Sequence, residues 1–302
     1  VFVNGEKGKV PTLVQRGQTL ELRHALRKEH EWGKGRAQVE VVYEDDVMAV
    51  VVKPQGMPTH GNRGGEDAGA TASLGASLKT AILYSLQPTP STDEPLRRPE
   101  HCHRLDAATF GLVLVAKTRP ALRRLTADFA ERRIRKQYRA VVHGKLIGEG
   151  VIEEPVDGTA AVTHWESART VRSLRWGWLT QVELRPLTGR RHQLRKHLAF
   201  LGHPIVGDAR YAKDPEQLHR GIGMLLAAVA LDFTHPISGK PQQIEVSEPP
   251  KFGKFLDRED ERWHSLAGGA DAAAADEQEE EESQKGVPAA CLEVEQRQDP
   301  TE

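Results

Sequence analysis

The sequence predicts an α+β domain with a mixed, mainly antiparallel sheet and flanking helices. Extended and helical segments alternate without a repeating βα period, which disfavours a doubly wound parallel sheet. Hydrophobic residues make up 38% of the 302 residues, and adding the 27 Gly brings the share to about 47%, as in globular proteins that bury a core. The longest uninterrupted apolar run, Val47–Val52, is far shorter than the ~18 residues of a membrane-spanning helix, so we expect none.

Charge divides the chain into two parts. Residues 257–302 carry 15 Asp and Glu against 4 Lys and Arg, a net charge of −11. Residues 1–256 carry 38 Lys and Arg against 28 Asp and Glu, a net charge of +10. The acidic part has almost no apolar periodicity and is predicted to be a disordered tail. The basic part suits an RNA or DNA partner, although charge alone fits a merely soluble surface equally well.

The first 36 residues form a small module of extended pieces. Asn4-Gly5 favours a tight hairpin turn, and Val10–Leu13 and Thr19–Leu22 supply further extended segments. The polar stretch His24–Gln38 then reads as a connector.

A hairpin entering the core is expected next. Val39–Val52 has two apolar stretches around the turn Glu44–Asp46, and Pro54 stops the second one. Gly61–Gly75 is rich in Gly and Ala and is predicted to be a loop.

A buried strand followed by a helix is the clearest local signal. Gly111–Ala116 is short, branched and wholly apolar, as expected of a strand covered on both faces. Thr118 can cap the next helix, whose core face contains Leu125. Residues 119–139 hold eight Lys and Arg against two Asp and Glu, so the opposite face is cationic. Farther on, Trp178–Leu184 reads as a strand.

The segment Gly189–Leu201 is predicted to be a helix that Gly202 closes. Leu194 and Leu198 would face the core, with Arg191 and Arg195 on an adjoining stripe. Arg195 at the edge of the apolar face could enter a cleft and pair with a carboxylate. A cationic surface helix is the alternative.

Two further polar positions interrupt apolar elements. Asp106 lies where a loop enters the buried strand, a common location for catalytic side chains, although an ion pair with Arg104 would also explain it. Tyr138 begins an apolar strand among cations, which suits stacking on a nucleic-acid base, although half-buried strand tyrosines are common.

Metal and disulfide chemistry are disfavoured. Only Cys102 and Cys291 occur, which indicates a reducing, intracellular setting. His192 and His197 are five positions apart and would lie on different helix faces, so no metal is expected. No cofactor is expected either.

Taken together and in order, these segments resemble the RluA-type RNA pseudouridine synthases over residues 39–250. The matching stretches are Glu44–Asp46 with Lys53–Gly56, His103–Asp106 with Thr109 and Gly111, Arg135–Gly144, Thr188–Arg190 with His192–Arg195, and Gly202–Asp208. The opening module is similar to the latter half of a small RNA-binding domain often fused to these enzymes. Phe110 departs from the family, which usually has Ser there.

The resemblance implies a central catalytic cleft and isomerisation of uridine to pseudouridine within structured RNA, either rRNA or tRNA. By position, Asp106 matches the catalytic aspartate, Tyr138 the active-site tyrosine and Arg195 the arginine that pairs with the aspartate. Whether the aspartate attacks the sugar or the base is left open. The RNA-binding residues are expected to be Arg104, which would help displace the target base, and His103, Arg190, Arg191, His192, Arg135, Lys136 and Lys53.

The expected organisation is a partial RNA-binding module at residues 1–36, a catalytic domain at 37–256 and the acidic tail at 257–302. We expect a monomer that binds RNA and neither membrane nor metal. A cytoplasmic location is expected, and an organellar one stays open because the chain starts at Val1 without an initiator Met. The alternative functions are a non-catalytic RNA-binding protein of the same fold and a scaffold that interacts through the tail.

Overall fold

The computed structural model divides the chain into two units, Val1–Arg36 and Ala37–Glu302. It describes residues 38–60, 77–212, 214, 217 and 221–266, together with three short strands in the first unit. The predictions for Val10–Leu13, for nearly all of the connector His24–Gln38, for Gly61–Gly75 and for residues 267–302 lie outside the described residues.

The first unit contains a three-stranded antiparallel sheet in the order β2-β1-β3. Its strands are β1 (Phe2–Val3), β2 (Glu6–Lys7) and β3 (Leu20–Glu21). Val3 pairs with Glu6 in antiparallel orientation. The turn predicted at Asn4-Gly5 lies outside the described residues.

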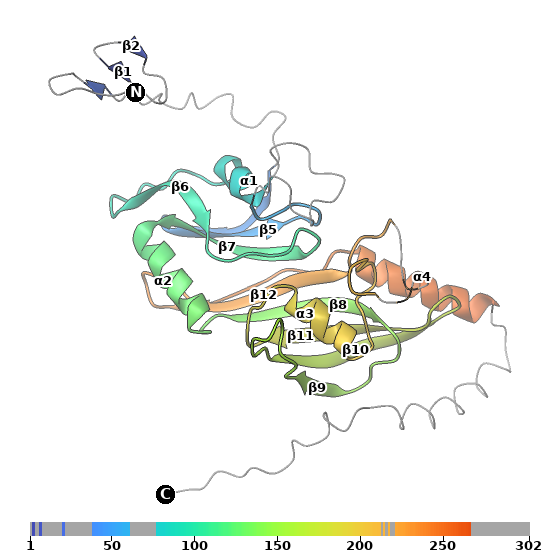
Figure 1. Ribbon diagram of the computed structural model, residues 1–302. Helices are drawn as coiled ribbons and strands as arrows, with labels where there is room; N and C mark the ends of the chain where they lie inside the picture. The colour runs from blue at the N-terminus through green and yellow to red at the C-terminus, as the bar shows by residue number, and fades with distance from the viewer. Residues whose placement is uncertain are drawn as a thin grey trace, which may run out of the picture. The chain divides into compact units, whose positions relative to one another are not determined.

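The second unit is organised by one ten-stranded sheet, with the order β4-β5-β7-β12-β8-β11-β10-β9, β6 on β7 and β13 on β12 (Figure 1). Its strands are β4 (Glu40–Glu44), β5 (Met48–Lys53), β6 (Pro95–His101), β7 (Phe110–Thr118), β8 (Arg135–His143), β9 (Glu149–Ile152), β10 (Thr163–Ser173), β11 (Gly177–Pro186), β12 (Leu226–Thr234) and β13 (Pro241–Glu245). Among these strands only β7 and β12 pair in parallel. The predicted mixed, mainly antiparallel α+β fold is confirmed.

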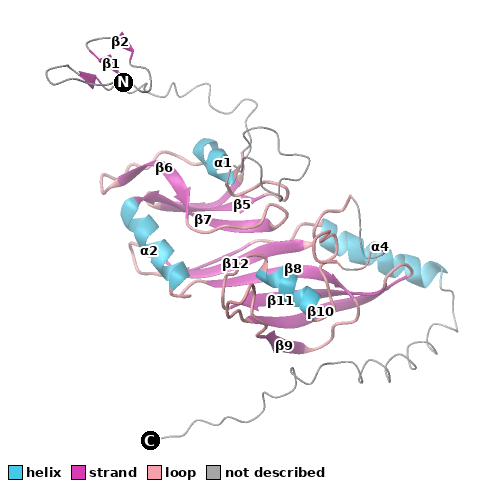
Figure 2. Ribbon diagram, viewed as in Figure 1, coloured by secondary structure: helices cyan, strands magenta, loops and turns pink. Residues whose placement is uncertain are grey.

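In the described residues, four helices accompany this sheet: α1 (Leu78–Ser85), α2 (Arg119–Ala130), α3 (Gln193–Phe200) and α4 (Lys251–Leu266) (Figure 2). Alternate residues of a strand face opposite sides, and the core clusters follow that rule. Val113 of β7 packs with α1 and Leu112 with α2, while Val142 of β8 packs with α3 and Val141 with α4. Thus α1 and α3 cover one face, and α2 and α4 the other. Within the described residues, no helix is long and apolar enough to cross a membrane.

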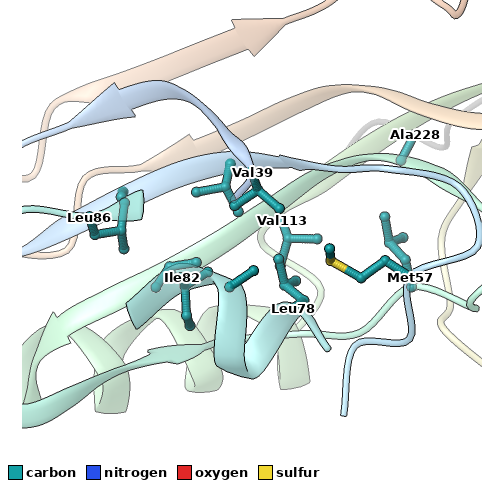
Figure 3. Packing of buried hydrophobic residues seen from close by; sticks show 12 residues of the cluster. Val39, Met57, Leu78, Ile82, Leu86, Val113 and Ala228 are labelled. Carbon is teal, nitrogen blue, oxygen red and sulfur yellow. The ribbon is translucent and has the colours of Figure 1, made fainter. Parts of the chain in front are cut away.

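The core under α1 includes a residue of the loop between β6 and β7. Leu78 and Ile82 of α1 pack with Val113 of β7, and Met57 and Ala228 belong to the same cluster (Figure 3). Leu105, in the loop between β6 and β7, is buried in it as well. The loop is therefore anchored in the core on the face that α1 and α3 cover.

Close backbone approach joins β7 to β12. Gly111 has φ +132°, and a Cβ built there would lie 2.1 Å from the carbonyl oxygen of Ala228. Only glycine can occupy this position without moving β12. Phe110 beside it packs into the clusters of the α2 and α4 face, so the residue that departs from the family pattern lies within these two hydrophobic clusters.

Helix α2 starts as predicted, whereas α3 starts four residues later than predicted. Thr118 Oγ1 accepts a hydrogen bond from the Ala121 backbone at 3.4 Å. Before α3, His192 has φ +57°, a left-handed conformation that cannot continue a right-handed helix. Gly202, at φ +84°, closes α3 as expected.

The predicted start of the disordered tail is wrong. Helix α4 continues to Leu266, ten residues into the predicted tail, and its buried residues include Leu256 and Glu259. Ser173 Oγ donates a hydrogen bond of 2.9 Å to the carboxylate of Glu259, which explains why an acidic side chain is tolerated there.

We predict that Gly111→Ala lowers the free energy of unfolding by about 3 kcal/mol or more, because it combines backbone strain with a clash against Ala228. Gly148→Ala is the matched control: Gly148 has φ +95°, but a Cβ there meets nothing within 4 Å. It should cost about 1–2 kcal/mol from strain alone. Chemical denaturation measures both, and equal losses would contradict the clash.

Candidate active site

A cavity of about 620 Å³ lies between the loop before β7, the end of α2, the start of β8 and the segment that leads into α3. Six Arg or Lys residues line it, and Asp106 is the single acidic residue among the described residues that do so. Residues far apart in the sequence thus place one carboxylate in a cationic cavity.

The loop that carries Asp106 is held through its backbone. Thr59 Oγ1 donates to the Leu105 carbonyl at 2.7 Å, and the Gly56 backbone N–H donates to the Ala107 carbonyl at 2.7 Å. Gln55 Nε2 donates to the Ala108 carbonyl at 2.9 Å. Hydrogen bonds from residues 53–59 therefore reach the carbonyls of Leu105, Ala107 and Ala108. These bonds restrict the backbone on both sides of Asp106. We call residues 53–59 the cradle segment.

Lys53 belongs to this cradle segment, and the prediction that it binds RNA is wrong. Its side chain is completely buried, and its Nζ donates to the carbonyls of Pro54, Met57 and Ala107 at 3.0, 2.8 and 3.2 Å. All three ammonium protons have partners, and none is left for a phosphate. Burial lowers the pKa of Lys53 to about 7, although the charge of Asp106 opposes this shift.

Arg195, near the start of α3, lies between two carboxylates. Its Nη1 is 3.4 Å from Asp106 Oδ2, which is the contact expected from the sequence. Its Nε and Nη2 donate to Asp208 Oδ2 and Oδ1, both at 2.7 Å. Burial opposes the charge on Arg195, but the hydrogen bonds and charge of Asp208, with a contribution from Asp106, raise its pKa overall. The guanidinium therefore stays cationic while nearly excluded from water.

His192 approaches the other side of Asp106. Its Nε2 lies 3.7 Å from Asp106 Oδ1, beyond hydrogen-bond length, so the interaction is electrostatic. Its Nδ1 is hydrogen-bonded to Tyr211 Oη at 2.9 Å. The histidine is buried and lies close to the Asp106 carboxylate, so it belongs to the centre of the site rather than its rim.

The turn into α3 is stabilised by Gln193. Gln193 Oε1 accepts from Thr188 Oγ1 at 2.7 Å and from the Arg190 backbone at 3.0 Å. Its Nε2 donates to the Val162 carbonyl and to Thr163 Oγ1. These bonds fix the tight segment before the helix and with it the position of His192.

Tyr138 lies on β8 at the junction of the two core clusters of this face. Burial raises the pKa of its hydroxyl, and the charge of Asp106 adds to that effect. The phenol is therefore neutral throughout the physiological range. Tyr138 lines the cavity together with Asp106 and Arg195, so the structure brings the three predicted catalytic side chains together.

The predicted RNA-binding cations divide into two groups. Arg104, Lys136, Arg190 and Arg191 line the cavity, and Arg132, which the sequence analysis did not single out, lines it as well. Arg104 and Arg191 are exposed, whereas burial lowers the pKa of Lys136, with a contribution from Arg132. Arg135 is elsewhere: it is 83% exposed, lies 3.6 Å from Asp232 and lines a second cavity.

Two other expectations need correction. Arg191 precedes α3 instead of sharing a helical stripe with Arg195, because the helix starts only at Gln193. His103 lines the cavity, but burial lowers its pKa to about 3, with the charge of Lys136 contributing. A neutral imidazole that accepts the Leu114 N–H at 3.1 Å adds no positive charge for RNA.

Asp208 and Tyr211 were not predicted to belong to the site, although Asp208 closes one of the quoted motifs. One signal was present: an arginine on the edge of an apolar helix face needs a carboxylate once it is buried, and Asp208 follows an apolar run that ends at Gly207. Tyr211 carried no comparable signal. Within the described part of the chain, no group of three His, Cys, Asp or Glu side chains is placed to hold a metal ion.

Comparison with known proteins gives concordant matches. The family model of RNA pseudouridylate synthase matches residues 47–200. Ribosomal large subunit pseudouridine synthase D of Vibrio parahaemolyticus is 31% identical over 275 residues, covering 82% of this chain and 79% of the relative. The protein of the same name from Xanthomonas campestris is 30% identical over 289 residues, covering 86% and 81%.

Solved structures support the fold. Human RNA Pseudouridylate Synthase Domain Containing 4 superposes with a TM-score of 0.52 at 24% identity, covering 72% of this chain and 92% of that one. Human RNA Pseudouridylate Synthase Domain Containing 1 gives the same TM-score and identity, with coverage of 70% and 84%. The family model spans Asp106, Tyr138 and Arg195, and a relative is 31% identical over 82% of this chain, so the chain belongs to the RNA pseudouridylate synthase family and is an isomerase that acts on RNA.

Proposed function

We propose that this protein converts a uridine in structured RNA to pseudouridine with Asp106 as the nucleophile. The contact of Asp106 with Arg195 inside a cationic cavity carries the proposal. The reaction breaks the bond between C1′ and N1, forms one between C1′ and C5, releases the proton of C5 and places a proton on N1. It changes no oxidation state and transfers no group to another molecule, so side chains that attack, stack and move protons are enough for it.

The cavity is of a suitable size for one extruded nucleotide. Its volume of about 620 Å³ lies within the range of small-molecule sites. A stacked uridine must leave the RNA before its glycosidic bond is accessible, which costs a few kcal/mol. Contacts of Arg104, Arg190 and Arg191 with phosphates would offset this cost.

Asp106 and Tyr138 have different roles in the proposed reaction. The backbone hydrogen bonds from the cradle segment and the contact with Arg195 hold the Asp106 carboxylate ready to attack the sugar or the base. Tyr138 stacks on the uracil ring, and its neutral hydroxyl relays the C5 proton instead of starting as a phenolate, since its pKa is raised.

For the substrate we favour ribosomal RNA over tRNA, because relatives at 30–31% identity bear the name ribosomal large subunit pseudouridine synthase. We also propose that one chain is sufficient, because Asp106, Tyr138 and Arg195 line the cavity from a single chain. A protein that only binds RNA would have no use for a carboxylate among phosphate contacts, which disfavours that alternative.

Asp106→Asn should lower turnover by at least about a thousandfold, because the amide is a poor nucleophile, while the Kd for RNA changes little. Tritium release from ribosomal RNA labelled at C5 of uridine measures turnover, with labelled tRNA in parallel. Asp232→Asn, which alters a carboxylate at the second cavity, is the control. Equal release by Asp106→Asn and the wild type would refute the assignment.

Tyr138→Phe retains the ring and removes the hydroxyl. We expect RNA affinity to stay unchanged and turnover to fall by about a hundredfold or more, the usual contribution of a proton-transferring group. Because the hydroxyl is neutral in the wild type, turnover should not rise with pH between about 7 and 9 through phenolate formation. A tenfold increase per pH unit that Tyr138→Phe abolishes would contradict a neutral relay.

Arg191→Gln should weaken RNA binding and reduce the slope of log Kd against log salt concentration by about 0.7–1, because one phosphate contact is lost. Arg135→Gln removes an equally charged side chain at the second cavity and should leave the slope unchanged. Filter binding at several salt concentrations separates the two. A reduced slope for Arg135→Gln with an unchanged slope for Arg191→Gln would indicate that RNA binds at the second cavity instead.

A further inference from the structure

The turn from Asp208 to Tyr211 contacts both groups that flank Asp106. Asp208 has a fully buried side chain, and its two carboxylate oxygens accept from Nη2 and Nε of Arg195 at 2.7 Å each. Two parallel hydrogen bonds fix the plane of a guanidinium. The remaining nitrogen, Nη1, is thereby directed at Asp106 Oδ2, 3.4 Å away.

Tyr211, at the other end of this turn, contacts the second flanking group. Its Oη is 2.9 Å from His192 Nδ1, and its ring centre lies 5.0 Å from the Arg195 Cζ. The backbone N–H of Tyr211 donates to Asp208 Oδ1 at 3.4 Å, as does that of Arg210 at 3.1 Å. Asp208 therefore orders the turn that carries Tyr211.

His192 is held in a conformation that it would not adopt unaided. Its φ of +57° is in the left-handed region, which costs a residue other than glycine free energy and persists only where the surroundings enforce it. In this conformation its Nε2 lies 3.7 Å from Asp106 Oδ1. A carboxylate on that side favours the tautomer with the proton on Nε2, and in that tautomer Nδ1 accepts a hydrogen bond from Tyr211 Oη.

We propose that Asp208 and Tyr211 are positioning residues of the reaction. Asp208 orients Arg195 toward one carboxylate oxygen of Asp106, and Tyr211 orients His192 toward the other. Contacts on both sides prevent the carboxylate from rotating and set its angle of attack before the uridine arrives. This inference rests on the proposed function, in which Asp106 is the reacting group.

Tyr211→Phe is the primary test, because it removes one hydroxyl and keeps the ring beside Arg195. Under single-turnover conditions with saturating enzyme and labelled ribosomal RNA, we expect tritium release to slow about three- to tenfold, the loss that one neutral hydrogen bond carries. The Kd for RNA should stay within about twofold. Tyr43→Phe is the matched control, since Tyr43 also donates a 2.7 Å hydrogen bond, to Asp45 in a turn of the sheet that the cavity does not include. It should react at the wild-type rate.

Epistasis shows whether Tyr211 acts through His192. His192→Gly removes the imidazole and tolerates the left-handed backbone. Adding Tyr211→Phe to His192→Gly should cause no further slowing, whereas an undiminished three- to tenfold effect would overturn the positioning role. Asp208→Asn should slow the reaction at least about tenfold, with a melting curve establishing that the variant is folded.

A wild-type rate in Tyr211→Phe overturns the inference for Tyr211, and one in folded Asp208→Asn overturns it for Asp208. Either result leaves the proposed function intact, provided that Asp106→Asn is inactive. Undiminished turnover in Asp106→Asn would instead remove the proposed function itself.

Discussion

One guanidinium held between two carboxylates is the interaction on which the rest of the site depends. Arg195 is nearly buried, and a buried charge is stable only with a partner. Asp208 supplies that partner permanently through two short hydrogen bonds, while the contact with Asp106 is longer. Asp208 thus neutralises the arginine by itself, and the charge of Arg195 does not depend on the longer contact with Asp106.

The site combines a rigid centre with a more accessible rim. At the centre, Gln55 Nε2 donates to the carbonyls of both Ala108 and Met224, so the Asp106 loop is tied to the segment that leads into β12. At the rim, Arg104 and Arg191 are exposed. Reacting groups gain from fixed geometry, whereas phosphate contacts gain from side chains that can follow an irregular RNA backbone.

Local patterns in the sequence predicted local structure, whereas the features that were not predicted depend on contacts between residues far apart in the chain. The apolar run Gly111–Ala116 was sufficient to predict β7, and Thr118 as a helix cap was sufficient to predict the start of α2. The late start of α3 depends on Gln193 bonding to Val162 and Thr163, thirty residues away in the chain, which no local pattern indicates. Because the segment from residue 257 onward is rich in acidic residues, it was predicted to be disordered, although α4 continues into it and Glu259 is buried there. Lys53 was expected to bind RNA, yet its ammonium group donates to three backbone carbonyls. Every residue has a backbone carbonyl, so the sequence does not indicate which carbonyls surround a lysine. Asp106, Tyr138 and Arg195 were singled out because a carboxylate, an aromatic ring and an arginine interrupt apolar elements, and the family resemblance supplied their expected roles; the structure places all three around one cavity.

The contacts of Gln55 affect the order in which parts of the molecule can fold during synthesis. Its amide bonds to the carbonyl of Met224 and to Lys251 Nζ, 169 and 196 positions later in the chain. During synthesis the amino-terminal half leaves the ribosome long before these partners exist. The strands around β5 and β7 can pair early, but the Asp106 loop gains its full support only when nearly all of the catalytic domain has been made. A chain interrupted before Met224 would therefore hold the Asp106 loop without the bond from Gln55 to Met224, and it would lack Leu226, which lines the cavity.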